Sequence, residues 1–215
     1  MAGKAVKKSG APDSRTRWVI LGVAAAMVVG LVLSIVLGGS DDPSSDATQV
    51  GSVEVVGDSL PPAEDPANDP AVGTKAPALK GVSFDGTPVS ITPGDGRRYL
   101  VLFLAHWCPH CQAEVPRLVD WYESGAVPDD LNIVGVSTAV TSTRPNYPPS
   151  DWLEREEWPW PVLVDSDSFD AAAAYGQSGF PYFVIIDENG LVAVRFAGEI
   201  ETAQLEAVLD SVFPT

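Results

Sequence analysis

The feature that most constrains the fold is an apolar run that ends directly at a pair of cysteines. Residues 99–105 (YLVLFLA) carry no charge, which is typical of a strand buried on both faces. The sequence HWCPHC follows at 106–111. Residues 109–124 then show apolar side chains at helical spacing, and Gly125 ends the pattern, with the predicted buried face at Val115, Leu118, Val119 and Tyr122. We therefore predict a buried strand that passes through a Cys-x-x-Cys motif into a helix.

The rest of the C-terminal region alternates strand and helix patterns. Apolar runs predict strands at 131–137 and 162–164. Turn residues predict two hairpins, one joining 82–84 to 89–91 through Asp85-Gly86 and one joining 182–187 to 191–196 through ENG at 188–190. Helices are expected at 151–157, with Asp151 as N-cap, at 168–175 and at 202–212. This order predicts an α/β fold with a mixed central sheet covered by helices.

The N-terminal third is divided by composition. Residues 18–37 are 20 residues without a charge, which as a helix would span about 30 Å, the thickness of a bilayer core. Five basic residues against one acidic residue precede it in 1–17, so we expect a transmembrane helix with its N-terminus in the cytoplasm. A cleaved signal peptide is the alternative. Residues 38–71 are rich in Asp, Ser and Pro and predict a flexible tether in which 53–56 is not expected to pair, so the folded domain is expected at 72–215.

Charge and cysteine content exclude several classes of protein. The formal net charge is −16, which argues against nucleic acid as a partner, because phosphate binding requires clustered Lys and Arg. With two cysteines in the chain, neither a disulfide-stapled small domain nor a four-cysteine zinc site is available. The two thiols are therefore the chemically informative residues.

The position of the two cysteines predicts redox chemistry. Cys108 would stand at a helix N-terminus, where unpaired N–H groups and the helix dipole favour a thiolate. Cys111, one turn further on, would be close enough to attack a mixed disulfide on Cys108. We therefore expect Cys108 to be the nucleophile, Cys111 the resolving thiol, and the pair to form a reversible Cys108–Cys111 disulfide.

Two other interpretations of the cysteines are less favoured. An inert structural disulfide would close a very short loop and so stabilise the fold little. A metal site would draw on His106 and His110 as well as the cysteines, but four ligands within six residues cannot easily surround a tetrahedral ion. We expect no metal and no cofactor.

Over about 72–215 the sequence resembles the TlpA/ResA-like membrane-anchored thiol–disulfide oxidoreductases of the thioredoxin superfamily. Residues 108–116 (CPHCQAEVP) match that family's C-x-x-C-x-x-E-x-P, and Phe180-Pro181 matches its cis-proline loop. The resemblance implies that Glu114 moves a proton to or from Cys111, although a solvated glutamate in the first helical turn is the alternative. It also implies that Trp107, Phe180 and Pro181 contact the client polypeptide beside Cys108.

The resemblance implies a protein-disulfide reductase that acts outside the cytoplasm. Its partners would be client protein thiols, such as apocytochrome c or secreted proteins, and a membrane redox partner. The dipeptide Pro109-His110, expected to tune the potential, is instead similar to the Cys-Pro-His-Cys of DsbA-like oxidases, because a cationic His110 would stabilise the thiolate. An oxidase therefore remains an alternative, as does a non-catalytic membrane-tethered binding module.

Overall fold

The computed structural model describes residues 47–213. Its centre is a five-stranded sheet in the order β6-β5-β4-β7-β8. Strands β4 (Arg98–Leu104), β5 (Leu131–Ser137) and β6 (Val162–Val164) are parallel, while β7 (Tyr182–Ile186) and β8 (Val192–Ala197) are antiparallel to their neighbours. A second sheet holds β1 (Glu54–Val56), β2 (Ala78–Val82) and β3 (Pro88–Ile91) in antiparallel order. The predicted mixed sheet is confirmed.

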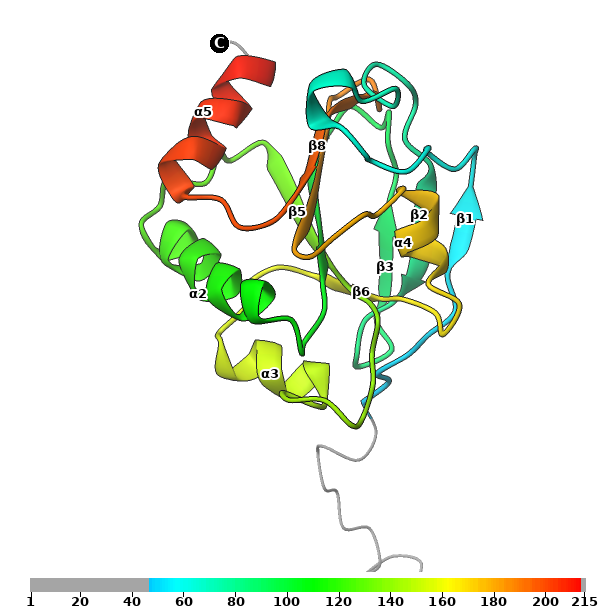
Figure 1. Ribbon diagram of the computed structural model, residues 1–215, viewed down its shortest axis with the longest axis vertical. Helices are drawn as coiled ribbons and strands as arrows, with labels where there is room; N and C mark the ends of the chain where they lie inside the picture. Colours follow the sequence, from blue (N-terminus) through cyan, green and yellow to red (C-terminus); the bar gives the residue numbers. More distant parts are fainter. Residues whose placement is uncertain (1–46, 214–215) are drawn as a thin grey trace, which may run out of the picture. The chain divides into compact units, whose positions relative to one another are not determined.

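Different elements cover the two faces of the central sheet (Figure 1). One face packs against α2 (Pro109–Glu123), α3 (Pro149–Arg155) and α5 (Thr202–Val212). The other face packs against α4 (Asp170–Ala174), the short 3-10 helix η1 (Pro66–Asn68) and the three-stranded sheet. Alternate residues of β4 enter the two cores, with Leu100 and Leu102 on one side and Val101 and Phe103 on the other, so β4 is buried on both faces as its apolar run predicts.

Most predicted elements are present within a few residues of their expected bounds, but two helix details are wrong. Asp151 lies in the first turn of α3, and the N-cap is Pro148, followed by Pro149 at a position that favours proline. In α2, Tyr122 is 50% exposed and Trp121 is buried in its place. The reason is α5, which packs beside α2 and provides Glu206 as hydrogen-bond acceptor for the Trp121 indole N–H at 2.9 Å.

The predicted tether is wrong for the residues that the structure describes, because the domain begins well before residue 72. Strand β1 pairs with β2, contrary to expectation. Leu60, Ala63 and Ala71 are buried in the core. The composition of 38–71 suggested too little apolar surface to fold, but a few well-placed apolar residues and an ion pair from Asp69 to Arg195 hold 47–71 against the sheet.

The other N-terminal predictions lie outside the described residues. These are the basic segment 1–17, the apolar stretch 18–37 and the first part of the tether, 38–46. Within residues 47–213, no helix has the length and apolar content needed to cross a bilayer.

Candidate active site

The two cysteines lie where β4 ends and α2 begins. Cys108 is the N-cap residue of α2, and its backbone N–H donates to the Ala105 carbonyl at 3.0 Å while its carbonyl accepts from Gln112 N–H at 3.0 Å. Cys111 is in the first turn. Both are free thiols in the structure, Cys108 with 6% of its surface exposed and Cys111 fully buried. Cys108 is therefore the sulfur that a partner molecule reaches first.

The loop before β7 approaches Cys108. The Phe180–Pro181 peptide bond is cis, as the resemblance implies. The Phe180 carbonyl oxygen lies 3.9 Å from the Cys108 Sγ, and the Phe180 ring meets the Trp107 ring edge-on with centroids 6.0 Å apart. Trp107 is fixed in turn by its indole N–H, which donates to the Ala139 carbonyl at 2.8 Å. Cys108 thus has an aromatic flank on one side and a backbone carbonyl facing it.

Cys111 is held in its thiol form by its surroundings. Burial raises the pKa of the Cys111 thiol, and the nearby Cys108 sulfur and Glu114 carboxylate raise it further, while a backbone hydrogen bond from Ala105 partly offsets the effect. A group that accepts the proton is therefore needed before Cys111 can act as a nucleophile.

Glu114 is buried one helical turn from Cys111, so its alternative role as a solvated first-turn glutamate is wrong. Its Oε2 accepts from Arg117 Nη1 at 2.5 Å and from the Ile200 backbone N–H at 3.1 Å. Its Oε1 is buried and has no hydrogen-bond partner among residues 47–213. Burial raises the pKa of Glu114, and the bonds from Ile200 and Arg117 oppose this effect. A buried carboxylate with one unoccupied oxygen beside a buried thiol is suited to proton transfer.

His110 takes part in a chain of charged groups. Its Nδ1 is 2.6 Å from Glu199 Oε1, and Glu199 Oε2 is 3.5 Å from Arg117 Nη2. Arg117 also pairs with Glu201 at 3.4 Å. The pair with His110 lowers the pKa of the Glu199 carboxyl. The chain connects His110 with Glu114, at the opposite end of the active-site turn.

His106 has a structural position, with its side chain buried beneath the segment that follows β5. Its Nδ1–H donates to the Pro145 carbonyl at 2.7 Å, and its Nε2 accepts from the Thr141 N–H at 3.2 Å, so the ring is neutral. Burial lowers the pKa of His106. Within residues 47–213, no group of three or more His, Cys, Asp and Glu side chains is placed to hold a metal ion.

Arg117, Glu199 and Ile200 were missed by sequence reasoning. Glu199 and Ile200 lie between β8 and α5, more than 80 residues from Arg117 and Glu114 in the sequence. Neither has a motif around it. Arg117 had a weak signal, since it lies three residues after Glu114 and can pair with it on one helix face.

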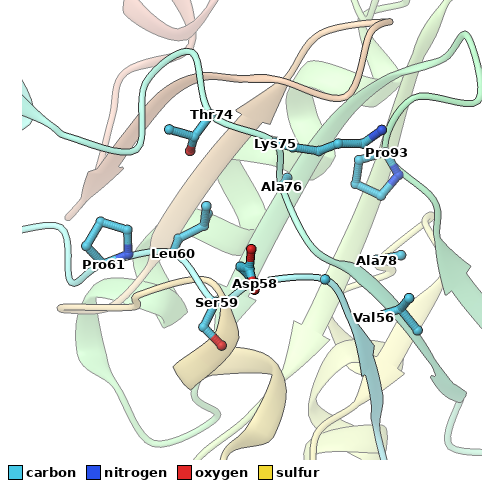
Figure 2. Close-up of a pocket in the computed structure, with 11 residues that line it drawn as sticks. Val56, Asp58, Ser59, Leu60, Pro61, Thr74, Lys75, Ala76, Ala78 and Pro93 are labelled. Atoms are coloured by element: carbon cyan, nitrogen blue, oxygen red, sulfur yellow. The ribbon is translucent and has the colours of Figure 1, made fainter.

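The cysteines do not line the pocket shown in Figure 2, which has a volume of about 570 Å³. That pocket lies between the end of β1 and residues 74–78, and its lining includes Val56, Leu60, Lys75 and Pro93. Cys108 and Cys111 instead lie at the start of α2, where Cys108 is slightly exposed beside the half-buried pair of Trp107 and Phe180. A sulfur that lies outside this pocket suits a polypeptide partner better than an enclosed small molecule.

Comparisons with known proteins agree with this geometry. Residues 72–195 match the model of the AhpC/TSA family. ResA, a thiol-disulfide oxidoreductase of Geobacillus thermodenitrificans, is 26% identical over 145 residues, covering 67% of this chain and 79% of the relative. Sporulation thiol-disulfide oxidoreductase A of Bacillus subtilis is 24% identical over 136 residues, covering 61% and 80%.

Solved structures show the same fold. The thioredoxin domain of a thiol-disulfide oxidoreductase from Bacteroides vulgatus has a TM-score of 0.53 at 25% identity, covering 66% of this chain and 96% of that one. A thioredoxin-family thiol:disulfide interchange protein from Chlorobium tepidum has a TM-score of 0.54 at 25% identity, covering 65% and 96%. The chain therefore belongs to the AhpC/TSA family, as a thioredoxin-like thiol–disulfide oxidoreductase related to ResA, StoA and TlpA-like proteins, with its active site at Cys108 and Cys111.

Proposed function

We propose that this chain is a membrane-tethered, extracytoplasmic reductase of disulfides in client proteins. Residues 1–17 would lie in the cytoplasm, 18–37 would cross the membrane, and the thioredoxin-like domain would lie outside. The single observation that carries the redox chemistry is the placement of Cys108 at the N-cap of α2 with buried Cys111 and Glu114 behind it.

In the first step, the Cys108 thiolate attacks one sulfur of a client disulfide. The client S–S bond breaks, a mixed disulfide forms between Cys108 and the client, and the other client sulfur leaves as a thiolate that takes a proton from water. Cys108 is positioned for this attack at the N-cap of α2.

In the second step, Cys111 releases the client. Glu114 accepts the Cys111 proton, the Cys111 sulfur attacks the Cys108 sulfur, and the second client sulfur leaves as a thiolate. The enzyme then holds a Cys108–Cys111 disulfide, and two electrons have passed to the client. A membrane partner with a dithiol of lower potential returns the pair to the reduced form.

We propose that the client lies as an extended segment against the loop of Phe180 and Pro181. The support is the half-buried pair of Trp107 and Phe180, whose rings supply an apolar surface beside Cys108. Client proteins of this type include apocytochrome c and secreted proteins with thiols that must stay reduced. Recognition by backbone and apolar contact tolerates varied client sequences.

The oxidase alternative is favoured by one observation, the Cys-Pro-His-Cys sequence. A charged His110 would stabilise the reduced enzyme and make the disulfide a stronger oxidant. In the structure, however, the imidazole faces Glu199 at 2.6 Å. This contact and the relation to ResA support the reductase role.

The test is the redox equilibrium of the full-length chain with glutathione, followed by alkylation of free thiols. The chain has two cysteines, so the readout reports this pair alone. A potential well below that of glutathione supports the reductase, and one well above it supports the oxidase. If the two cysteines cannot be reversibly oxidised and reduced, the catalytic proposal is wrong, and a non-catalytic binding module is the remaining alternative. The Cys111→Ser variant should trap clients on Cys108, and the Cys108→Ser variant is the matched control.

A further inference from the structure

We propose that Glu199 is a positioning residue that sets the redox equilibrium of the cysteine pair by holding and neutralising His110. This inference rests on the proposed function, since it concerns the potential at which Cys108 and Cys111 exchange electrons. It assigns a role to Glu199, which lies in the segment between β8 and α5.

The two side chains are in close contact although they lie far apart in the sequence. His110 is the second residue of α2, and its Nδ1 lies 2.6 Å from Glu199 Oε1, 89 residues later in the chain. The His110 side chain is 66% exposed and that of Glu199 is 33% exposed, so Glu199 is the more enclosed partner. The imidazole therefore points its Nδ1 at a carboxylate.

The second carboxylate oxygen of Glu199 is held by another contact. Its Oε2 is 3.5 Å from Arg117 Nη2, and Arg117 also pairs with Glu114 and with Glu201. These charged groups come from α2 and from the segment before α5. Glu199 is thus held between Arg117 and His110, with one carboxylate oxygen facing each.

The consequence concerns the charge that the Cys108 thiolate experiences. An imidazolium next to the N-cap of α2 would favour the thiolate, and hence the reduced enzyme. A carboxylate paired with that imidazolium cancels most of its field, and it occupies the Nδ1–H that would otherwise be free to approach the thiolate. The reduced form then loses that stabilisation, and the pair becomes a better electron donor than its Cys-Pro-His-Cys sequence suggests.

A double-mutant cycle on the full-length chain tests the proposal. The variants are Glu199→Gln, which keeps the shape and the hydrogen-bond acceptor but removes the charge, His110→Ala, and the double variant. Glu201→Gln is the matched control, because it removes an equal charge that also pairs with Arg117, whereas within residues 47–213 the ion pair of His110 is with Glu199. The glutathione equilibrium of each variant is measured between pH 5 and pH 8, the range over which an imidazole ordinarily changes its charge.

We expect Glu199→Gln to shift the equilibrium toward the reduced enzyme by about three- to fivefold, the size typical of a partly exposed charge pair. His110→Ala should remove this shift in the Glu199→Gln background and should change the original chain less than twofold. A shift below about twofold in Glu199→Gln, an equal shift in Glu201→Gln, or the same effect of His110→Ala in both backgrounds would overturn the proposal. A pair that does not cycle in any variant would instead refute the proposed function.

Discussion

Arg195 on β8 is buried against Asp69, 126 residues earlier in the chain, with its Nε 2.8 Å from Asp69 Oδ2. The guanidinium also donates to the carbonyls of Pro61 and Tyr175 at 3.0 and 2.9 Å. Four hydrogen bonds from one buried cation are thus directed at the N-terminal segment or at the end of α4. The ion pair ties the residues before 72 to the central sheet.

Replacing Asp69 by Asn should lower the free energy of unfolding by about 3–5 kcal/mol, because it leaves a buried guanidinium without its counter-charge. The hydrogen bond from Arg195 lowers the pKa of Asp69, so this contribution is present above about pH 4 and is lost as the pH falls through the folded-state pKa. Denaturant unfolding at pH 7 and pH 3 measures both effects. Asp65→Asn, an exposed change in the same segment, is the control, and equal losses in the two variants would contradict the prediction.

Removing the segment should have a similar effect. A chain that begins at residue 72 lacks β1, Leu60, Ala63 and the Asp69 partner of Arg195, whereas a chain that begins at 47 keeps them. We expect the shorter chain to be less stable by at least the 3–5 kcal/mol of the lost ion pair. The midpoints of thermal unfolding of the two chains are compared under one condition. Equal midpoints would show that residues 47–71 do not contribute to the stability of the domain.

Glu114→Gln should slow the second step of exchange and leave the first step nearly unchanged. The amide cannot accept the Cys111 proton, and loss of a general base typically costs about 10²- to 10⁴-fold in rate. Rapid mixing with a model disulfide, with quantification of the mixed disulfide on Cys108, separates the two steps. Glu123→Gln, an exposed change near the end of the same helix, should behave like the original chain. Equal slowing of both steps would argue for a structural role of Glu114.

His106 should give the domain a pH-dependent stability. Burial lowers its pKa below the unfolded value of about 6.5, so its contribution is present above that pH and is lost as the pH falls toward the folded-state pKa. The free energy of unfolding should therefore decrease between pH 7 and pH 5 by more in the original chain than in His106→Gln. If the free energy of unfolding changes equally with pH in the two proteins, His106 has the same proton affinity in the folded and unfolded states.

The central strands and the active-site turn were predictable because their signals are local. The apolar run that became β4 has to be buried on both sides, and the cysteine spacing places Cys108 and Cys111 one helical turn apart. The buried face of α2 was predicted less well. Helical periodicity identifies a stripe, but only the position of α5 decides that Trp121 is covered and Tyr122 is not.

Contacts between polar residues that are distant in the sequence could not be predicted, because no local sequence pattern indicates them. Glu199 meets His110 only because β8 returns the chain to the N-terminal end of α2, and no local pattern encodes that return. The same holds for Asp69 and Arg195. Composition was misleading there, since Asp and Pro are frequent in unfolded linkers, whereas this Asp is a buried counter-ion.

The packing of 47–71 against the sheet also changes the reach of the enzyme. If 18–37 crosses the membrane as proposed, nine residues, 38–46, remain before the folded domain, and they extend to at most about 30 Å. A free segment of 38–71 would extend to about 115 Å. The folded domain would then begin within about 30 Å of the bilayer rather than up to about 115 Å from it, which favours clients close to the membrane.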